Sequence, residues 1–172
     1  MNNKMKSRWV VMGVSGAGKS EIGARLAAAL AVPFLEGDSF HPQENVARMS
    51  AGIALNDDDR AGWLHTLSIE IGRARERGEG LVLSCSSLKR RYRDQLRSGD
   101  PDLRFAYLHG ERTVLEQRMR TRPGHYMPAS LLDSQLRDLE PLQADEAGVQ
   151  LDLTQTPQQL IDTILKSLEC QA

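Results

Sequence analysis

The sequence lacks several features that mark specialised classes of protein. Its 172 residues include two cysteines, Cys85 and Cys170, which are too few for a disulfide framework and lack the Cys-x-x-Cys spacing of a structural zinc site. No apolar run approaches the roughly 18 residues of a membrane-spanning helix. The short apolar run behind the basic start ends at Gly13, too soon for a secretory signal. We therefore expect a protein of the reducing cytoplasm.

An excess of either charge is also missing. Lys and Arg number 22 against 23 Asp and Glu, and the net charge is −1. Proteins whose surface is built for nucleic acid or anionic lipid carry a large positive excess, so we expect neither a nucleic-acid partner nor a membrane partner. The composition, 40% hydrophobic and 26% charged, is typical of a globular chain. Its length predicts one domain over residues 1–172, with residues 1–7 loose.

Short apolar runs alternate with helical patterns along the chain, which is typical of an α/β protein with a parallel sheet. Apolar residues at helical spacing predict helices at 20–30, around 64–74 and around 132–139. A last helix is predicted after Thr156 as the N-cap, with Pro157 at the first helical position. The predicted strands are residues 9–12, 33–35, 81–84, 105–108 and 149–153.

The strongest motif is a phosphate-binding loop between the first predicted strand and the first predicted helix. It matches G-x-x-x-x-G-K-[ST] in full. Its glycines let backbone N–H groups point at phosphate oxygens, and the following helix N-terminus adds a partial positive charge. We expect Lys19 to reach the β- and γ-phosphates of a nucleoside triphosphate and the Ser20 hydroxyl to coordinate Mg²⁺. The residues expected to bind the triphosphate are Gly13, Val14, Ser15, Gly16, Ala17, Gly18, Lys19 and Ser20.

Other segments narrow the class of nucleotide-binding protein. A GTP-dependent switch would need an Asn-Lys-x-Asp segment, which the sequence lacks. Asp59-Arg-Ala-Gly62 matches D-x-x-G by letters only, because it follows polar residues and not an apolar strand. A motor ATPase needs a much longer chain. A small-molecule kinase is the class that remains, with a nucleotide-gated binding module as the non-enzymatic alternative.

A second group of candidate residues follows the second predicted strand, in the segment Glu36-Gly-Asp-Ser-Phe-His-Pro. Ligands of an open parallel sheet lie beyond the carboxyl ends of its strands, so Asp38 and His41 are expected to project toward the phosphates. Asp38 is suited either to accept the proton of an attacking hydroxyl or to hold a water bound to Mg²⁺. The alternative is that both residues belong to a turn without a chemical role.

Arginine supplies 17 of the 22 basic residues, and many of these arginines fall in two segments. Five cations lie between Lys89 and Arg97, where we expect one or two to hold an anionic acceptor and the others to form a solvated helix face. Arg118 and Arg122 precede a Pro-Gly break and are expected to belong to a lid, about residues 118–135, that closes over the transferring phosphoryl group. A compatible alternative is that they favour the dipole of a helix C-terminus.

Together these motifs resemble those of the gluconate kinases (gluconokinases), in the shikimate-kinase and nucleoside-monophosphate-kinase-like group. Beyond the phosphate loop, the similarity rests on G-D-S-F-H-P-Q-E-N at 37–45, C-S-S-L-K-R-R-Y-R-D at 85–94 and R-P-G-H-Y-M at 122–127. The resemblance implies a P-loop NTPase fold with a five-stranded parallel sheet in the order 2-3-1-4-5. It also implies ATP-dependent phosphorylation of D-gluconate to 6-phosphogluconate, with Mg²⁺ and commonly a homodimer. Another small hydroxy acid or polyol, such as shikimate, is the alternative acceptor.

The same resemblance implies roles for individual residues. Lys19, Asp38 and Arg122 are expected to carry catalysis, and Arg118 and Arg122 to hold ATP together with the phosphate loop. By analogy with similar kinases, residues 154–157 are expected at the adenine edge. The residues expected to bind the acceptor are Asp38, His41, Arg60, Lys89, Arg93, His125 and Gln135.

Overall fold

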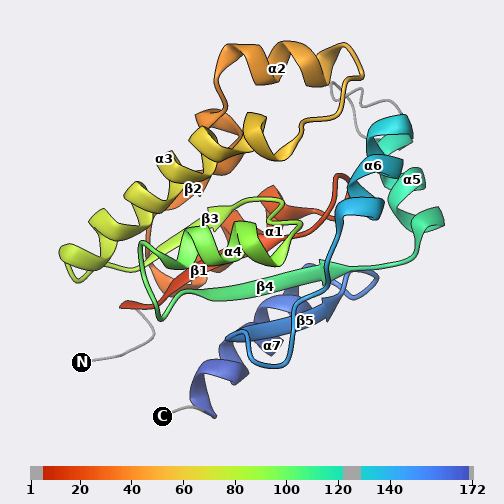
Figure 1. Cartoon of the computed structure of the whole chain (residues 1–172). Helices are drawn as coiled ribbons and strands as arrows, with labels where there is room; N and C mark the ends of the chain where they lie inside the picture. The colour runs from red at the N-terminus through yellow and green to blue at the C-terminus, as the bar shows by residue number, and fades with distance from the viewer. Residues whose placement is uncertain (1–5, 122–128, 171–172) are drawn as a thin grey trace.

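The computed structural model describes residues 6–121 and 129–170, in which five parallel strands form one sheet (Figure 1). The strand order is β2-β3-β1-β4-β5, which confirms the predicted order. β2 begins one residue later than predicted, because Pro33 has no N–H to donate to the ladder. The strands are β1 (Arg8–Met12), β2 (Phe34–Glu36), β3 (Leu81–Ser84), β4 (Arg104–His109) and β5 (Gly148–Asp152).

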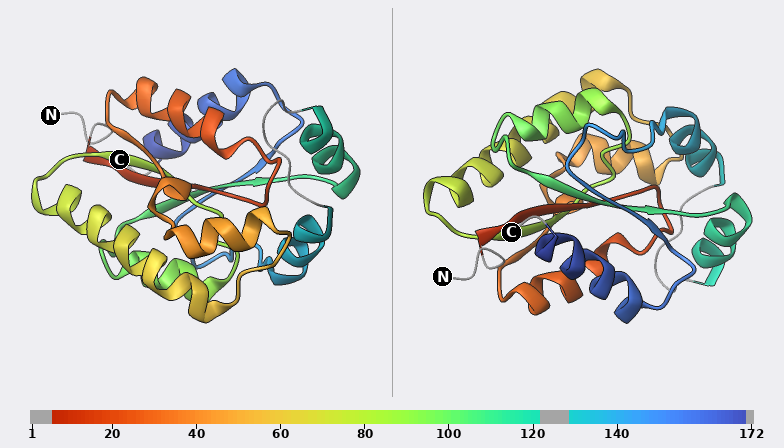
Figure 2. Two further views of the ribbon diagram at one scale, coloured as in Figure 1. Left: turned by 90° about the horizontal axis from the view of Figure 1, so that it is seen from above. Right: turned by 90° about the horizontal axis from the view of Figure 1, so that it is seen from below.

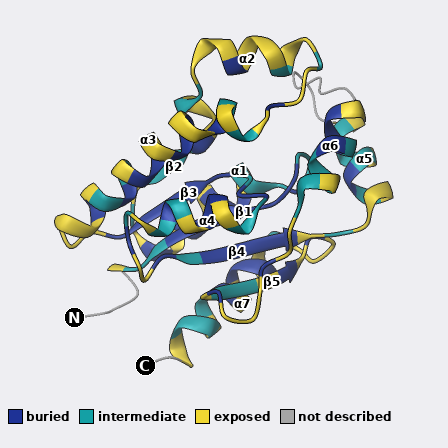
Figure 3. Ribbon diagram, in the orientation of Figure 1, coloured by how far each residue is buried: buried dark blue, intermediate teal, exposed yellow. Residues whose placement is uncertain are grey.

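Helices cover both faces of the sheet (Figure 2). On one face lie α1 (Lys19–Leu30) and α7 (Pro157–Glu169), and on the other lie α3 (Asp57–Glu76) and α4 (Arg90–Arg97). The central strands are therefore buried on both sides, as Figure 3 shows. Burial on both faces explains why the strands appear in the sequence as short continuous apolar runs, without an alternation of apolar and polar residues.

Side-chain caps set where two of these helices begin. The Thr156 hydroxyl accepts a hydrogen bond from the Gln159 N–H, and the Gln159 side chain accepts one from the Thr156 N–H, which confirms the predicted start of α7. Asn56 and Asp59 form the same reciprocal cap at the start of α3. The cap fixes the first turn of α3 and with it the position of the next residue, Arg60.

Shorter helices gather at the carboxyl ends of the strands. The 3-10 helix η2 (Gly37–Phe40) continues β2 and leads into α2 (Gln43–Ser50). Beyond β4, α5 (Arg112–Thr121) and α6 (Ala129–Asp138) lie side by side (Figures 1 and 2). Because open parallel sheets bind ligands at this end, these helices surround the expected site.

The start of the chain is partly tied to the sheet. Residues 1–5 lie outside the described residues. The Ser7 carbonyl accepts a hydrogen bond from the Leu81 N–H at 3.2 Å, and its hydroxyl accepts one from Trp9 Nε1 at 3.2 Å. The prediction of a loose segment through residue 7 is therefore wrong at Ser7. Within the two described ranges, no helix has both the length and the apolar character that crossing a membrane requires.

Candidate active site

The phosphate loop joins β1 to α1 and depends on glycine. Gly16 has φ 84° and Gly18 has φ 92°, in the left-handed region that favours glycine. A Cβ on Gly16 would lie 2.9 Å from the Leu115 carbonyl oxygen and 3.0 Å from Met119 Cγ, so α5 packs directly on the loop. Because α1 begins at Lys19, the loop ends at a helix N-terminus, where backbone N–H groups favour an anion.

A cavity of about 400 Å³ opens beside this loop and has a size suited to a small ligand such as a nucleotide. Arg118 from α5 lies on its wall and donates a hydrogen bond from Nη2 to the Leu153 carbonyl at 2.5 Å. Gln155 and Pro157 line the cavity on the side of α7, within the segment predicted for the adenine edge. The loop, Arg118 and the connection from β5 to α7 therefore share one cavity.

Glu36 is a site residue that was not predicted from the sequence. Its Oε2 accepts a hydrogen bond from Ser20 Oγ at 2.5 Å, and its Oε1 accepts one from Ser84 Oγ at 2.5 Å. Ser84 Oγ in turn accepts from the Gly37 N–H at 3.3 Å. Glu36 and Ser84 are register partners in β2 and β3, so the sheet itself brings them together. This contact depends on the pairing of β2 with β3, and no local pattern in the sequence predicts which residues of the two strands lie opposite each other.

Ser20 and Glu36 form an oxygen donor set that fits a magnesium ion. Mg²⁺ prefers carboxylate and hydroxyl oxygens and is usually bound by one or two protein groups together with substrate phosphates. Here the hydroxyl and the carboxylate are already in contact, next to the predicted phosphate-binding Lys19. Asp38 lies two residues beyond Glu36, at the start of η2.

Trp63 of α3 holds the segment that carries Asp38 and His41. Its Nε1 donates to the Gly37 carbonyl at 2.8 Å, and its ring stacks on the His41 ring at a centroid distance of 3.9 Å. Burial lowers the pKa of His41, and the smaller influences of Asp38, which raises this pKa, and Arg60, which lowers it, act on the same ring. His41 is therefore a neutral ring at neutral pH, close to both of those charges.

Two of the predicted acceptor anchors meet around Tyr92. Arg60 Nη1 donates to the Tyr92 hydroxyl at 3.0 Å, and Lys89 Nζ donates to Asp57 Oδ1 at 3.1 Å. Both cations lie over the Tyr92 ring, at 5.5 and 5.7 Å from its centroid. The structure thus brings Arg60 from α3 and Lys89 from the start of α4 together around Tyr92, where Lys89 pairs with Asp57 and Arg60 with Asp138.

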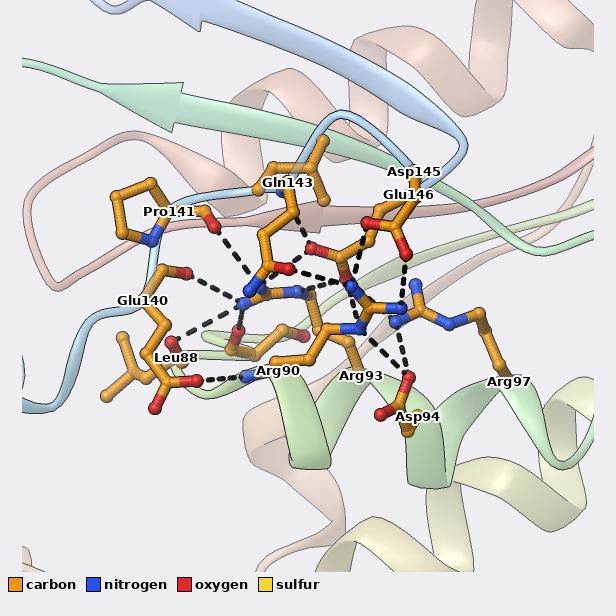
Figure 4. Close-up of polar contacts among 12 residues, drawn as sticks. Leu88, Arg90, Arg93, Asp94, Arg97, Glu140, Pro141, Gln143, Asp145 and Glu146 are labelled. Atoms are coloured by element: carbon orange, nitrogen blue, oxygen red, sulfur yellow. Dashed lines mark hydrogen bonds and ion pairs between the residues drawn. The ribbon is translucent and has the colours of Figure 1, made fainter.

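Arg93, the third predicted anchor, is placed elsewhere, and that prediction is corrected. Its side chain is fully buried, and it donates from Nε and Nη2 to both carboxylate oxygens of Glu146, at 2.7 and 2.9 Å (Figure 4). Its Nη1 donates to the carbonyls of Ser87 and Glu140 at 2.9 and 3.0 Å. This geometry leaves Arg93 no exposed donor for a substrate. It ties α4 to the segment between α6 and β5.

Gln135 of α6, which was predicted to bind the phosphoryl acceptor, contacts the phosphate loop. Its Oε1 accepts from the Ser15 N–H at 2.8 Å, and its Nε2 donates to Ser15 Oγ at 3.1 Å. One turn later on α6, Asp138 pairs with Arg60 at 3.4 Å. The helix α6 therefore contacts both the phosphate loop and Arg60 of α3. The lid expected over about residues 118–135 stays a prediction. The predicted residues Arg122 and His125 lie outside the described residues.

Cys85, which follows β3, is a packing residue. It is 1% exposed, and burial raises the pKa of its thiol to about 11. The side chain is therefore a neutral thiol at neutral pH and is not a nucleophile.

Comparison with known proteins identifies the group to which the chain is similar. The shikimate kinase family model matches residues 15–169. A thermosensitive gluconokinase of Escherichia coli K12 is 44% identical over 141 residues, covering 82% of this chain and 75% of that protein. A gluconokinase of Gluconobacter oxydans is 40% identical over 162 residues, covering 94% of this chain and 91% of that protein.

Solved structures agree with the sequence relatives. A gluconokinase from Sinorhizobium meliloti superposes with a TM-score of 0.87 at 45% identity, covering 98% of this chain and 94% of that one. An unliganded sugar kinase from a Janibacter species gives a TM-score of 0.90 at 47% identity, covering 95% and 94%. Shikimate kinase from Aquifex aeolicus, at 16% identity and a TM-score of 0.60, shares the fold.

Proposed function

This chain belongs to the gluconokinase family, within the group that the shikimate kinase model describes, and we propose that it transfers the terminal phosphoryl group of ATP to D-gluconate. The observation that carries this proposal is the meeting of two sets of residues at one end of the sheet. The phosphate loop with Arg118 suits the nucleotide. Arg60 and Lys89, which meet around Tyr92, together with His41, on which Arg60 acts electrostatically, suit a small anionic acceptor.

Residues of the phosphate loop and its surroundings bind and orient the nucleotide. The loop N–H groups and Lys19 hold the phosphates, and Arg118 adds a cation on the cavity wall. Ser20 and Glu36 are the residues that would hold Mg²⁺, which neutralises charge on the phosphate oxygens when it is bound. Catalysis of phosphoryl transfer depends mostly on such positioning and electrostatic stabilisation.

The acceptor side supplies a base and a set of cations. Asp38 accepts the proton of the terminal hydroxyl of gluconate as that oxygen attacks the γ-phosphorus, and the bond to the ADP oxygen breaks. Arg60 and Lys89 attract the gluconate carboxylate, and the neutral His41 ring stays close enough to contact its hydroxyl groups. The products are 6-phosphogluconate and ADP. On the family resemblance we also propose a cytoplasmic homodimer.

Release of ADP in a coupled assay tests the proposal across a panel of acceptors. The panel contains gluconate, related sugar acids, shikimate and nucleoside monophosphates. We expect turnover with gluconate to exceed that with every other member. Faster turnover with shikimate would identify a different kinase, and ADP release that no acceptor stimulates would favour a nucleotide-gated binding module.

A further inference from the structure

Asn45, in α2, has no role in the reaction as described so far, although its side chain is held in place on both sides. The residue is 4% exposed. Its Nδ2 donates to the Asp59 carbonyl oxygen at 2.8 Å and lies 3.3 Å from Nδ1 of His41. Asn45 thus links the start of α3 to the imidazole ring in the acceptor site.

These two contacts determine where the ring carries its proton. A backbone carbonyl only accepts hydrogen bonds, so the amide group of Asn45 must turn its nitrogen, and not its oxygen, toward Asp59. The amide nitrogen is a donor only, so His41 Nδ1 must be the acceptor of its second hydrogen. A neutral imidazole with an unprotonated Nδ1 carries its proton on Nε2.

The stacking on Trp63 fixes the plane of the same ring. With centroids 3.9 Å apart and an angle of 18° between the planes, His41 cannot tilt away without losing this contact. Trp63 is itself held by its hydrogen bond to the Gly37 carbonyl. Asn45 and Trp63 together therefore define the rotation, the plane and the proton of the imidazole.

We propose that Asn45 is a positioning residue that holds His41 as the Nε2–H tautomer, so that Nε2 donates a hydrogen bond to an oxygen of the acceptor. The identity of the acceptor rests on the proposed function, whereas the tautomer does not. A ring held in this way has no free lone pair for the proton of the attacking hydroxyl. The role of base therefore falls to Asp38, and His41 acts as a donor that orients the substrate.

Nitrogen NMR of the imidazole rings tests the tautomer in the free protein. The full chain is labelled with ¹⁵N-histidine, and the His41 signals are identified by their loss in His41→Gln. We expect Nδ1 of His41 to show the signal of an unprotonated nitrogen and Nε2 that of a protonated one at pH 7. A protonated Nδ1, or an average of both tautomers, would overturn the proposal without any reference to activity.

Variants of Asn45 test whether this residue affects binding of the phosphoryl acceptor. Asn45→Ala is expected to release the tautomer preference and to raise KM for gluconate about three- to tenfold, as expected for one weakened hydrogen bond, with KM for ATP unchanged. Asn45→Asp places an acceptor beside Nδ1 and is expected to move the proton to that nitrogen.

Arg48→Ala is the matched control. Arg48 lies on the same helix and binds the Asp59 carboxylate at 2.8 Å, so its removal loosens the contact between α2 and α3 without touching His41. Asn45→Ala spectra and KM values equal to those of Arg48→Ala would refute the positioning role. If the panel of acceptors shows no gluconate phosphorylation but the Nε2–H tautomer is present, the proposed function fails and only the tautomer is supported.

Discussion

Replacement of Arg93 by Met separates a structural role of this residue from a role in binding. Methionine keeps much of the side-chain volume but removes every donor of the guanidinium. In the native protein these donors serve both carboxylate oxygens of Glu146 and four backbone carbonyls, and the Arg93 side chain is fully buried. We therefore expect Arg93→Met to reduce stability strongly and to leave gluconate binding unchanged.

The expected loss of unfolding free energy depends on which hydrogen bonds to the Glu146 carboxylate remain in the variant. Breaking a buried ion pair costs about 3–5 kcal/mol, because it leaves a charge without its partner. Arg97 Nη2 at 2.7 Å and the Gln143 N–H at 2.8 Å still bind the Glu146 carboxylate in the variant, so we expect the lower end, about 3 kcal/mol. For a chain of this size, that corresponds to a fall in Tm of roughly 6–12 °C.

The loss also depends on pH. Burial alone would raise the pKa of Glu146, but the hydrogen bonds from Arg93, the Gln143 N–H and Arg97 outweigh it, and the pKa lies below its usual range. A carboxyl group with a lowered folded-state pKa stabilises the protein above its unfolded pKa of about 4.3, and this stabilisation disappears as the pH falls through the folded-state pKa. We expect the difference between Arg93→Met and wild type to be full at pH 7 and to shrink in acid.

Thermal and urea unfolding at pH 7 and in acid measure this difference, with Arg90→Met as the control on the same helix. Arg90 pairs with Asp94 and Asp145 at the surface and approaches Glu146 at 3.7 Å, beyond hydrogen-bond distance, so its replacement is expected to cost less than about 1 kcal/mol. KM for gluconate is measured well below the unfolding transition. A stability loss below about 1 kcal/mol in Arg93→Met, or a tenfold rise in KM, would refute the reasoning and restore Arg93 as an anchor.

Three further substitutions test other parts of the structure. Lys19→Ala should lower kcat at least about 100-fold and change the unfolding midpoint far less, because it removes a charge from the phosphates, whereas within the fold it removes a hydrogen bond to the Val14 carbonyl at 3.1 Å. Ser84→Ala takes a partner from Glu36 and should raise the Mg²⁺ concentration for half-maximal nucleotide binding, measured by calorimetry, whereas Ser84→Thr and the control Ser68→Ala should not. Gly62→Ala should stabilise the protein by about 0.5–1 kcal/mol in thermal unfolding, because, apart from its two neighbours and the backbone of α3 itself, no heavy atom of the described residues lies within 4 Å of the added Cβ.

Local signals in the sequence were sufficient to predict the sheet and the phosphate loop. The alternation of apolar runs with helical periodicity gave all five strands to within one or two residues, and Thr156 with Pro157 marked the start of α7. The loop was predictable because its glycines and Lys19 are adjacent in the chain. Each of these features depends on neighbours a few residues apart.

Contacts between distant residues were not predictable in the same way. Glu36 meets Ser84 through strand pairing, and Gln135 reaches Ser15 across 120 residues. Arg93 was placed wrongly because α4 is eight residues long and rich in arginine, so its pattern does not show which cation turns inward. Burial of Arg93 depends on Glu146, which lies in another part of the chain.

The identity of the product tests the central claim most directly. The wild-type protein is incubated with ATP, Mg²⁺ and D-gluconate, and phosphorus and carbon NMR identify where the phosphoryl group has been transferred. We predict 6-phosphogluconate formed in a one-to-one ratio with ADP, and loss of this product in Asp38→Asn. A phosphate on another hydroxyl, ADP formed without any sugar phosphate, or undiminished product from Asp38→Asn would contradict the account.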